Sequence, residues 1–274
     1  MKKKDFGPKI FDLLLLFLVF LFFQYITMII LNLILLPFEL TQDKINLIYS
    51  LSIPPISFGL ILYFGFKRSK IKVKSLFRNT DLSLLKLIAL LILAISLNII
   101  LSELNNILQC FFPLSENSVK EINIHLFNSS LPITIISIIS TVITVTLEEI
   151  FFRGIILKTL LQRYSVSIAI LSTSCFALLF SFDLQHIISL FTLHLLLGWL
   201  YARTGSLINA TLGRILYHSI TMMAIYLLPY KIRGFNSKLT SVATFQPLWF
   251  NLLGVVLLIL GVLLLYIDLK RGDN

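Results

Sequence analysis

Long apolar runs, separated by short polar segments, dominate the chain. Eight of these runs are long enough, or nearly so, to cross about 30 Å of hydrocarbon as a helix. The 187–202 run is short for a span, so we expect it to be tilted or buried within the bundle. The pattern predicts an all-α fold, a polytopic transmembrane helix bundle of about eight spans. The runs cover residues 10–36, 46–66, 84–103, 132–150, 166–185, 187–202, 206–229 and 246–268.

Composition supports the bilayer as solvent and argues against a nucleic-acid partner. The chain is 57% hydrophobic and only 13% charged, whereas soluble domains are about a quarter charged. Its net charge of +10 fits basic residues collected in cytoplasmic loops. No aromatic-basic interleaving or Gly-rich phosphate loop occurs outside the spans. Cys110 and Cys175 have no CxxC partner, which excludes a disulfide framework and a thiolate metal site.

The distribution of Lys and Arg predicts the orientation. The strongly basic segment 67–86 is expected in the cytoplasm, and the Lys2-Lys3-Lys4 terminus, two spans earlier, then faces the same side. The 10–36 run is too long for the apolar part of a signal peptide, so we interpret it as a retained first span. Abundant Lys, Ile, Asn and Phe suggest an AT-rich bacterial genome. We therefore expect a multi-pass protein of the bacterial inner membrane with a cytoplasmic N-terminus.

Two adjacent carboxylates and an arginine interrupt the apolar run near residue 150. Glu149 and Arg153 are i, i+4 neighbours on a helix and can form an ion pair. Glu148 is turned about 100° away from Glu149, which leaves it for another role, such as a general base. Alternatively, the cluster lies at a helix end and snorkels to the cytoplasmic interface. A site that Glu148 shares with residues of later spans has a geometric requirement. Either this helix continues to about Leu160, which brings Glu148 deeper, or a later segment is broken or re-entrant.

Three histidines follow in the apolar C-terminal half: His186, His194 and His218. A lone histidine in such a setting is more commonly a satisfied core residue, and we expect this of His194. Imidazole together with a carboxylate can position and activate water, with or without a divalent metal. The set therefore makes Glu148 a candidate water activator.

These motifs together resemble a known family. Glu148 to Arg153 reads EExxxR, Phe182 to His186 reads FxxxH, and Gly198 to Leu207 is similar to a G-x5-TGSL segment that precedes His218. Over about residues 130–228 their order and spacing resemble the CPBP family of CAAX proteases and bacteriocin-processing enzymes, also called the Abi family. This resemblance predicts N-terminal transmembrane helices and a polar loop over 1–130, a catalytic core over 131–230, and a loop and C-terminal helix over 231–274.

The resemblance implies an intramembrane endopeptidase. Glu148 would activate the hydrolytic water, and His186 and His218 would orient it or help to stabilise the oxyanion. Glu149, Arg153 and Phe182 would be supporting residues. The cofactor is left open: a divalent metal such as zinc, bound by the three catalytic residues, or no metal. The expected partners are the lipid bilayer and a membrane-embedded or lipid-anchored peptide or protein substrate.

One departure from the family pattern keeps an alternative open. The last motif, HxxxN or HxxxD, reads His218 to Met222 here, and loss of one oxyanion donor can lower a rate by about 10²–10³. Thr221 or Ser219 could substitute for the missing polar group, although both are expected to point elsewhere on the helix. The alternative is a non-catalytic relative, a bacteriocin immunity protein or a regulatory binding partner. A small transporter that uses Glu148 and Glu149 is disfavoured because no inverted repeat is present.

Overall fold

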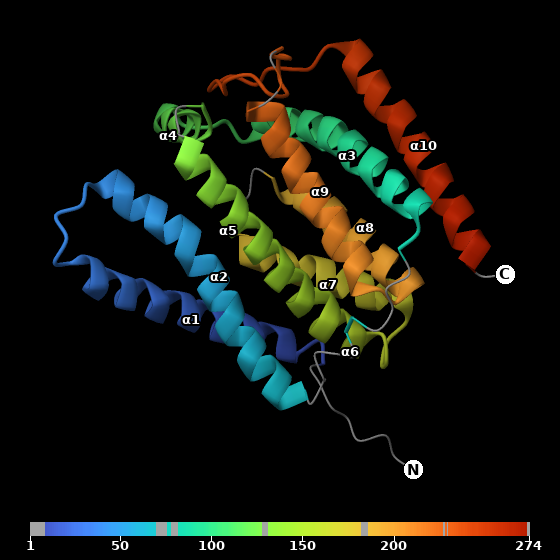
Figure 1. Ribbon diagram of the computed structural model, residues 1–274, viewed down its shortest axis with the longest axis horizontal. Helices are drawn as coiled ribbons and strands as arrows, with labels where there is room; N and C mark the ends of the chain where they lie inside the picture. The colour runs from blue at the N-terminus through green and yellow to red at the C-terminus, as the bar shows by residue number, and fades with distance from the viewer. Residues whose placement is uncertain are drawn as a thin grey trace. The chain divides into compact units, whose positions relative to one another are not determined.

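The structure, a computed structural model, describes residues 9–69, 76–77, 82–127, 131–181, 186–226, 228 and 230–272. These residues form helices and connecting turns, with no strand among them, which confirms the predicted all-α class. Figure 1 shows the helices in chain order: α1 (Asp12–Leu35), α2 (Gln42–Ser69), α3 (Leu84–Phe111), α4 (Glu116–Phe127), α5 (Leu131–Glu149), η2 (Ile150–Leu157), α6 (Lys158–Leu160), α7 (Val166–Ser181), α8 (Ile187–Thr204), α9 (Leu207–Tyr226) and α10 (Leu248–Gly272).

Each of the eight predicted spans corresponds to a helical segment. Six segments in the described part of the chain are both long and apolar enough to cross a bilayer. α7 has only 16 residues, and α9, although 20 residues long, includes Asn209, Arg214 and His218. The six segments are Asp12–Leu35, Lys44–Lys67, Leu84–Phe111, Ile133–Leu160, Ile187–Thr204 and Leu248–Arg271. The chain is an integral, multi-pass membrane protein.

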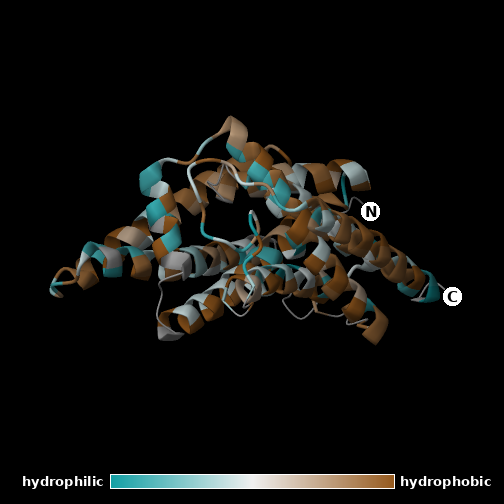
Figure 2. Ribbon diagram, turned by 90° about the horizontal axis from the view of Figure 1, so that it is seen from above, coloured by the Kyte–Doolittle hydropathy of each residue, from teal (hydrophilic) through white to brown (hydrophobic). Residues whose placement is uncertain are grey.

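The exposed helix surfaces are apolar, as lipid contact requires. Large hydrophobic side chains are exposed along α10, for example Leu252 at 57%, Val256 at 60% and Ile259 at 56%. Figure 2 shows α10 as hydrophobic over most of its length, with hydrophilic residues near the C-terminus. A continuous apolar surface of this kind is unfavourable in water and is compatible with hydrocarbon.

The chain forms two compact units. The first comprises Met1–Thr80, Ile135–Ser181 and Gly198–Thr211, and the second comprises Asp81–Thr134, Phe182–Leu197 and Leu212–Asn274. Each unit is therefore assembled from segments that are far apart in the sequence.

Aromatic side chains form the core of the first unit. α1 and α2 lie side by side in it (Figure 1). The ring centroids of Phe20 and Phe180 are 4.4 Å apart, and those of Phe152 and Phe180 are 5.3 Å apart. Phe58 stacks on the same cluster. Aromatic pairs at these separations stabilise beyond the area they bury, and here they fix η2 against α1, α2 and α7.

A close pair of helices, α3 and α10, forms the core of the second unit (Figure 1). Two glycines of α10 permit the close approach, because a Cβ at Gly254 would lie 2.7 Å from Ile99 Cγ2 and one at Gly261 would lie 2.8 Å from Leu93 Cγ. At one end of the pair, Lys86 Nζ lies 3.2 Å from a carboxylate oxygen of Asp268, with both side chains buried. Small residues at helix contacts are typical of membrane interiors.

The segment 230–247, which connects α9 to α10, is non-helical but tightly bound to α3 and α4. The Nδ2 of Asn106 donates a 2.8 Å hydrogen bond to the carbonyl oxygen of Gly234. The side chain of Asn123 pairs with both backbone groups of Leu239, at 2.9 Å each. These bonds satisfy backbone groups that no helix or sheet serves, and they fix the segment in one place.

Candidate active site

One continuous helical segment, Ile133–Leu160, carries the Glu148, Glu149 and Arg153 cluster. It comprises most of α5 followed by η2 and α6. Glu148 lies near the middle of this 28-residue segment, which ends at Leu160 as in the first of the two alternatives that the sequence left open. The Glu149 and Arg153 side chains are only 0% and 1% exposed, which does not fit snorkelling to an interface.

The segment changes from an α-helix to a π-helix at the cluster. Ile150–Leu157 is an eight-residue π-helix in which the N–H of Lys158 reaches the carbonyl oxygen of Arg153, five residues back. The sequence predicts a regular helix here and gives no sign of the wider turn. π-helical turns are rare and frequently occur at functional sites. A Cβ at Gly154 would lie 3.0 Å from Leu76 Cδ1, so the π-helix packs closely against this side chain.

The two adjacent glutamates have different surroundings. Arg153 Nη1 lies 2.8 Å from Glu149 Oε1, which confirms the predicted i, i+4 ion pair. Glu148, in contrast, is half-buried. A buried ion pair fixes orientation more reliably than it adds stability, so the Glu149–Arg153 pair holds the helix turn that carries Glu148.

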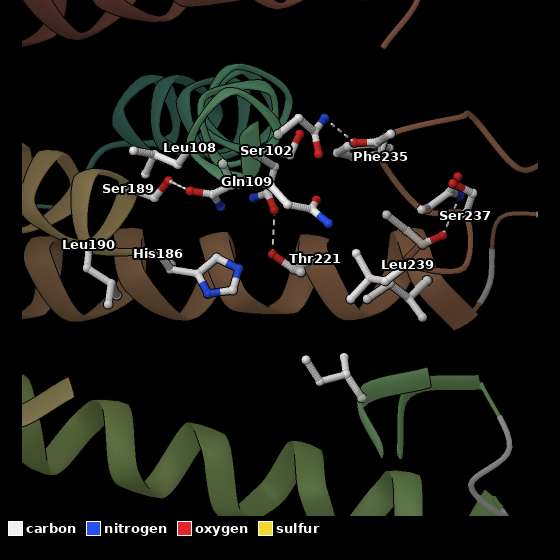
Figure 3. Close-up of a pocket in the computed structure, with 18 of the residues that line it drawn as sticks. Ser102, Leu108, Gln109, His186, Ser189, Leu190, Thr221, Phe235, Ser237 and Leu239 are labelled. Atoms are coloured by element: carbon white, nitrogen blue, oxygen red, sulfur yellow. Dashed lines mark hydrogen bonds between the residues drawn. The ribbon is translucent and has the colours of Figure 1, made fainter. Parts of the chain in front are cut away.

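The second unit contains a cavity of about 370 Å³ that both candidate histidines, His186 and His218, line. Its wall is formed by α3, α8, α9 and the segment 230–247 (Figure 3). The described polar side chains on this wall are amides, hydroxyls and imidazoles, with no carboxylate or cation among them. A volume of this size is typical of a small ligand or a few residues of peptide.

His218 lies within α9, where its ring is 5.4 Å from the Tyr217 ring in an edge-to-face arrangement. Its Nε2 atom is buried and has no hydrogen-bond partner among the described residues. A buried imidazole nitrogen normally carries a partner. This nitrogen, on a residue that lines the cavity, is therefore available to a water or a substrate group.

His186 is exposed and immediately precedes α8. Its carbonyl oxygen accepts the N–H of Leu190 at 2.8 Å, so it caps the first turn of that helix. Phe182, the predicted supporting residue, and Asp183 lie outside the described residues. His194 is 4% exposed and does not line the cavity, which confirms the prediction of a buried packing residue.

The prediction that Thr221 points elsewhere is wrong. Thr221, three residues after His218, lines the same cavity, and Met222 does not. Residues separated by three positions share a helix face, which accounts for the placement. The Thr221 hydroxyl donates to Asn98 Oδ1, from α3 (Figure 3). The polar groups next to His218 on the cavity wall are therefore the Thr221 hydroxyl and the Asn98 amide, rather than a side chain at position 222.

The sequence contains a signal for the α3 side of the cavity that motif matching missed. Asn98, Ser102, Asn105 and Gln109 recur at helical spacing inside an apolar span, and all four line the cavity. Polar residues within a span usually mark function or pairing. This periodic polar stripe could therefore have been identified without a structure.

No group of three or more His, Cys, Asp or Glu side chains suited to a metal ion occurs among the described residues. Among the residues that line the cavity, the imidazole nitrogens of His186 and His218 are donor atoms of the kind that zinc prefers. Glu148 belongs to the first unit.

Comparison with known proteins adds an independent observation. Residues 130–224 match the family described as type II CAAX prenyl endopeptidase Rce1-like. No curated protein and no solved structure matches the chain. The matched residues include all three candidate catalytic residues and end within α9. Residues 130–224 are therefore similar to this Rce1-like family of type II CAAX prenyl endopeptidases.

Proposed function

We propose that the protein is an intramembrane endopeptidase that cleaves a peptide bond in a membrane-embedded or lipid-anchored peptide or protein. Glu148 activates the hydrolytic water, and His186 and His218 orient it. The observation that carries the proposal is the family match over residues 130–224. Support comes from the position of Glu148 in mid-span and from the cavity that both histidines line.

The reaction follows from the chemistry of these side chains. The Glu148 carboxylate accepts a proton from water as the water oxygen bonds to the substrate carbonyl carbon. The resulting oxyanion is stabilised by hydrogen-bond donors on the cavity wall. The C–N bond then breaks, and the proton passes from Glu148 to the departing amine. A divalent metal, where one is used, would be held by Glu148, His186 and His218 and would polarise the carbonyl.

The test compares Glu148→Gln with a matched control, Glu116→Gln, at an exposed position on α4. Each protein is reconstituted into liposomes with a quenched farnesylated CAAX-type peptide and, separately, with a single-span peptide. We expect cleavage of one of the two probes by the wild type and by Glu116→Gln. Glu148→Gln should be slower by about 10²–10⁴-fold, the usual contribution of a general base. Equal rates for Glu148→Gln and the wild type would overturn the proposal.

The role of a metal is tested in the same assay. The protein is incubated with 1,10-phenanthroline and dialysed, and Zn²⁺ is then added back to half of the sample. This treatment distinguishes a metal-dependent mechanism from a metal-free one. Loss and recovery of cleavage assign a metal, and unchanged cleavage assigns a metal-free mechanism.

Met222 favours a second candidate function, a non-catalytic membrane binding protein. In this case neither probe is cleaved, and Glu148→Gln preserves the cellular phenotype of the wild type. Met222→Asn would also leave that phenotype unchanged. A gain of cleavage by Met222→Asn would instead indicate an enzyme with reduced activity.

We also propose that the protein resides in a bacterial inner membrane with a cytoplasmic N-terminus. The basic segment 67–86 supports this orientation. A fluorescent protein that matures only in the cytoplasm is fused to the N-terminus. Cells that carry this fusion should be fluorescent. An alkaline phosphatase fused there and found active would contradict the orientation.

A further inference from the structure

Two asparagines of α3 hydrogen-bond to the helices next to the candidate histidines: α9, which carries His218, and α8, which follows His186. Asn98 and Asn105 are seven residues apart, which places them two turns apart on one face of α3. The helix is long and apolar enough to span the membrane. Burial of a side-chain amide in such a helix costs free energy unless the amide is hydrogen-bonded. The hydrogen-bond partners of each asparagine therefore indicate its structural role.

Asn98 binds the turn of α9 that contains His218. Its Nδ2 donates to the carbonyl oxygens of Ala94 at 2.8 Å and of Tyr217 at 2.9 Å. Its Oδ1 accepts the hydroxyl of Thr221. Tyr217 and Thr221 flank His218 within about one turn, so a single amide holds that turn at two points.

Asn105 binds the first turn of α8, which follows His186. Its Oδ1 lies 2.5 Å from Ser189 Oγ (Figure 3). The same hydroxyl lies 3.1 Å from the carbonyl oxygen of Leu101. Ser189 is three residues after His186, and both line the cavity. The hydroxyl is therefore anchored on α3, and it lies one helical turn from the imidazole.

The two arrangements are alike in sequence and in bonding. Each histidine is followed three residues later by a hydroxyl residue, in His186-x-x-Ser189 and in His218-x-x-Thr221. Each hydroxyl is bonded to the side-chain oxygen of an asparagine on α3. The remaining α3 amides bind differently, since Asn106 bonds to Glu103 and Gly234.

We propose that Asn98 and Asn105 are positioning residues, with Asn98 fixing His218 through α9 and Asn105 fixing His186 through α8. Two anchor points about 10 Å apart on one rigid helix then set the placement of both imidazoles on the cavity. α3 lies outside the residues that match the family. The catalytic value of this placement rests on the proposed function, whereas the bonds themselves do not.

The test reads each imidazole separately. The chain contains four histidines, so histidine-selective ¹⁵N labelling gives four rings, assigned by single His→Gln variants. Asn98→Leu should shift the His218 ring resonances and leave those of His186 in place. Asn105→Leu should do the reverse. The matched control is Ser96→Ala, because Ser96 is buried on α3 and its hydroxyl donates to the Leu93 carbonyl oxygen of its own helix; it should move neither ring.

Variants of the hydroxyl residues that the two asparagines bind provide the same test if an asparagine variant fails to fold. Thr221→Val should reproduce the His218 shift, and Thr221→Ser, which retains the hydroxyl, should restore the wild-type resonance. Ser189→Ala and Ser189→Thr should do the same for His186. The proposal is overturned if Thr221→Val leaves His218 in place, or if removal of either asparagine shifts both histidines equally.

A kinetic readout separates this proposal from the proposed function. In an active enzyme, Asn98→Leu should lower kcat by about 10–10²-fold with KM nearly unchanged, because misplacement of a catalytic group affects the chemical step. Histidine-specific shifts in a protein without peptidase activity would refute the proposed function alone. Unchanged histidine resonances in an active enzyme would refute the positioning role alone.

Discussion

Arg153 and Glu149 form a 2.8 Å ion pair whose two side chains are almost wholly buried, and Glu148 lies directly beside it. In low dielectric such a pair exists only because each charge neutralises the other. The pair lies where an α-helix changes to a π-helix. The buried couple thus lies next to a second carboxylate, Glu148, that is only half-buried.

Removal of one partner from this pair should strongly destabilise the protein. Arg153→Met leaves the Glu149 charge buried, and this type of change costs about 3–5 kcal/mol. Unfolding of the purified protein in detergent, followed by circular dichroism, measures the loss. The double variant Glu149→Leu/Arg153→Met should recover most of it, because no buried charge remains. A single variant as stable as the wild type would contradict the buried pair.

The α3–α10 contact predicts a strong size limit at Gly261. An added Cβ would lie 2.8 Å and 2.9 Å from side-chain atoms of Leu93 and 3.2 Å from its backbone nitrogen. Gly261→Ala should therefore cost about 1–3 kcal/mol, as overpacked cores do. The control is Gly59→Ala in α2, where nothing lies within 4 Å of the new Cβ, and helix propensity predicts a gain of up to about 1 kcal/mol. Equal thermal stabilities of the two variants would refute the close packing.

Gly234 should tolerate no side chain, for two separable reasons. Its φ is +71°, and an added Cβ would lie 2.5 Å from the carbonyl oxygen of Thr244. Asn adopts positive φ more readily than Ala, yet both carry a Cβ. We expect Gly234→Ala and Gly234→Asn to increase hydrogen exchange across 230–247 to a similar extent. Protection by Asn but not by Ala would mean that φ, rather than the backbone contact, sets the requirement.

The spans and the ion pair could be predicted from the sequence because each depends on local spacing. The thickness of the hydrocarbon fixes the length of an apolar run, and helical periodicity brings Glu149 to Arg153. The burial of His194 could be predicted for the same reason, since it lies within a continuous apolar run.

Features that depend on which helices meet could not be predicted in this way. The π-helix after Glu149 leaves no mark in the residue pattern. Motif spacing directs attention to Met222, whereas the polar groups at the cavity are Thr221 and Asn98, the latter more than a hundred residues earlier in the chain. Asn98 and Asn105 were visible as polar positions, but their partners on α9 and α8 become known only from the packing of the second unit.

We propose that Glu148, His186 and His218 act as one catalytic unit, and a double-variant cycle of cleavage rates measures whether they do. Single-turnover cleavage of the farnesylated CAAX-type peptide is measured for Glu148→Gln, His218→Ala and the double variant, then for the corresponding set with His186→Ala. When two residues act in the same step, removal of the second adds little to the loss of rate that removal of the first has caused. We therefore predict that each double variant is no slower than its slower single variant. Losses that multiply, or full activity in Glu148→Gln, would contradict a shared role in activating water.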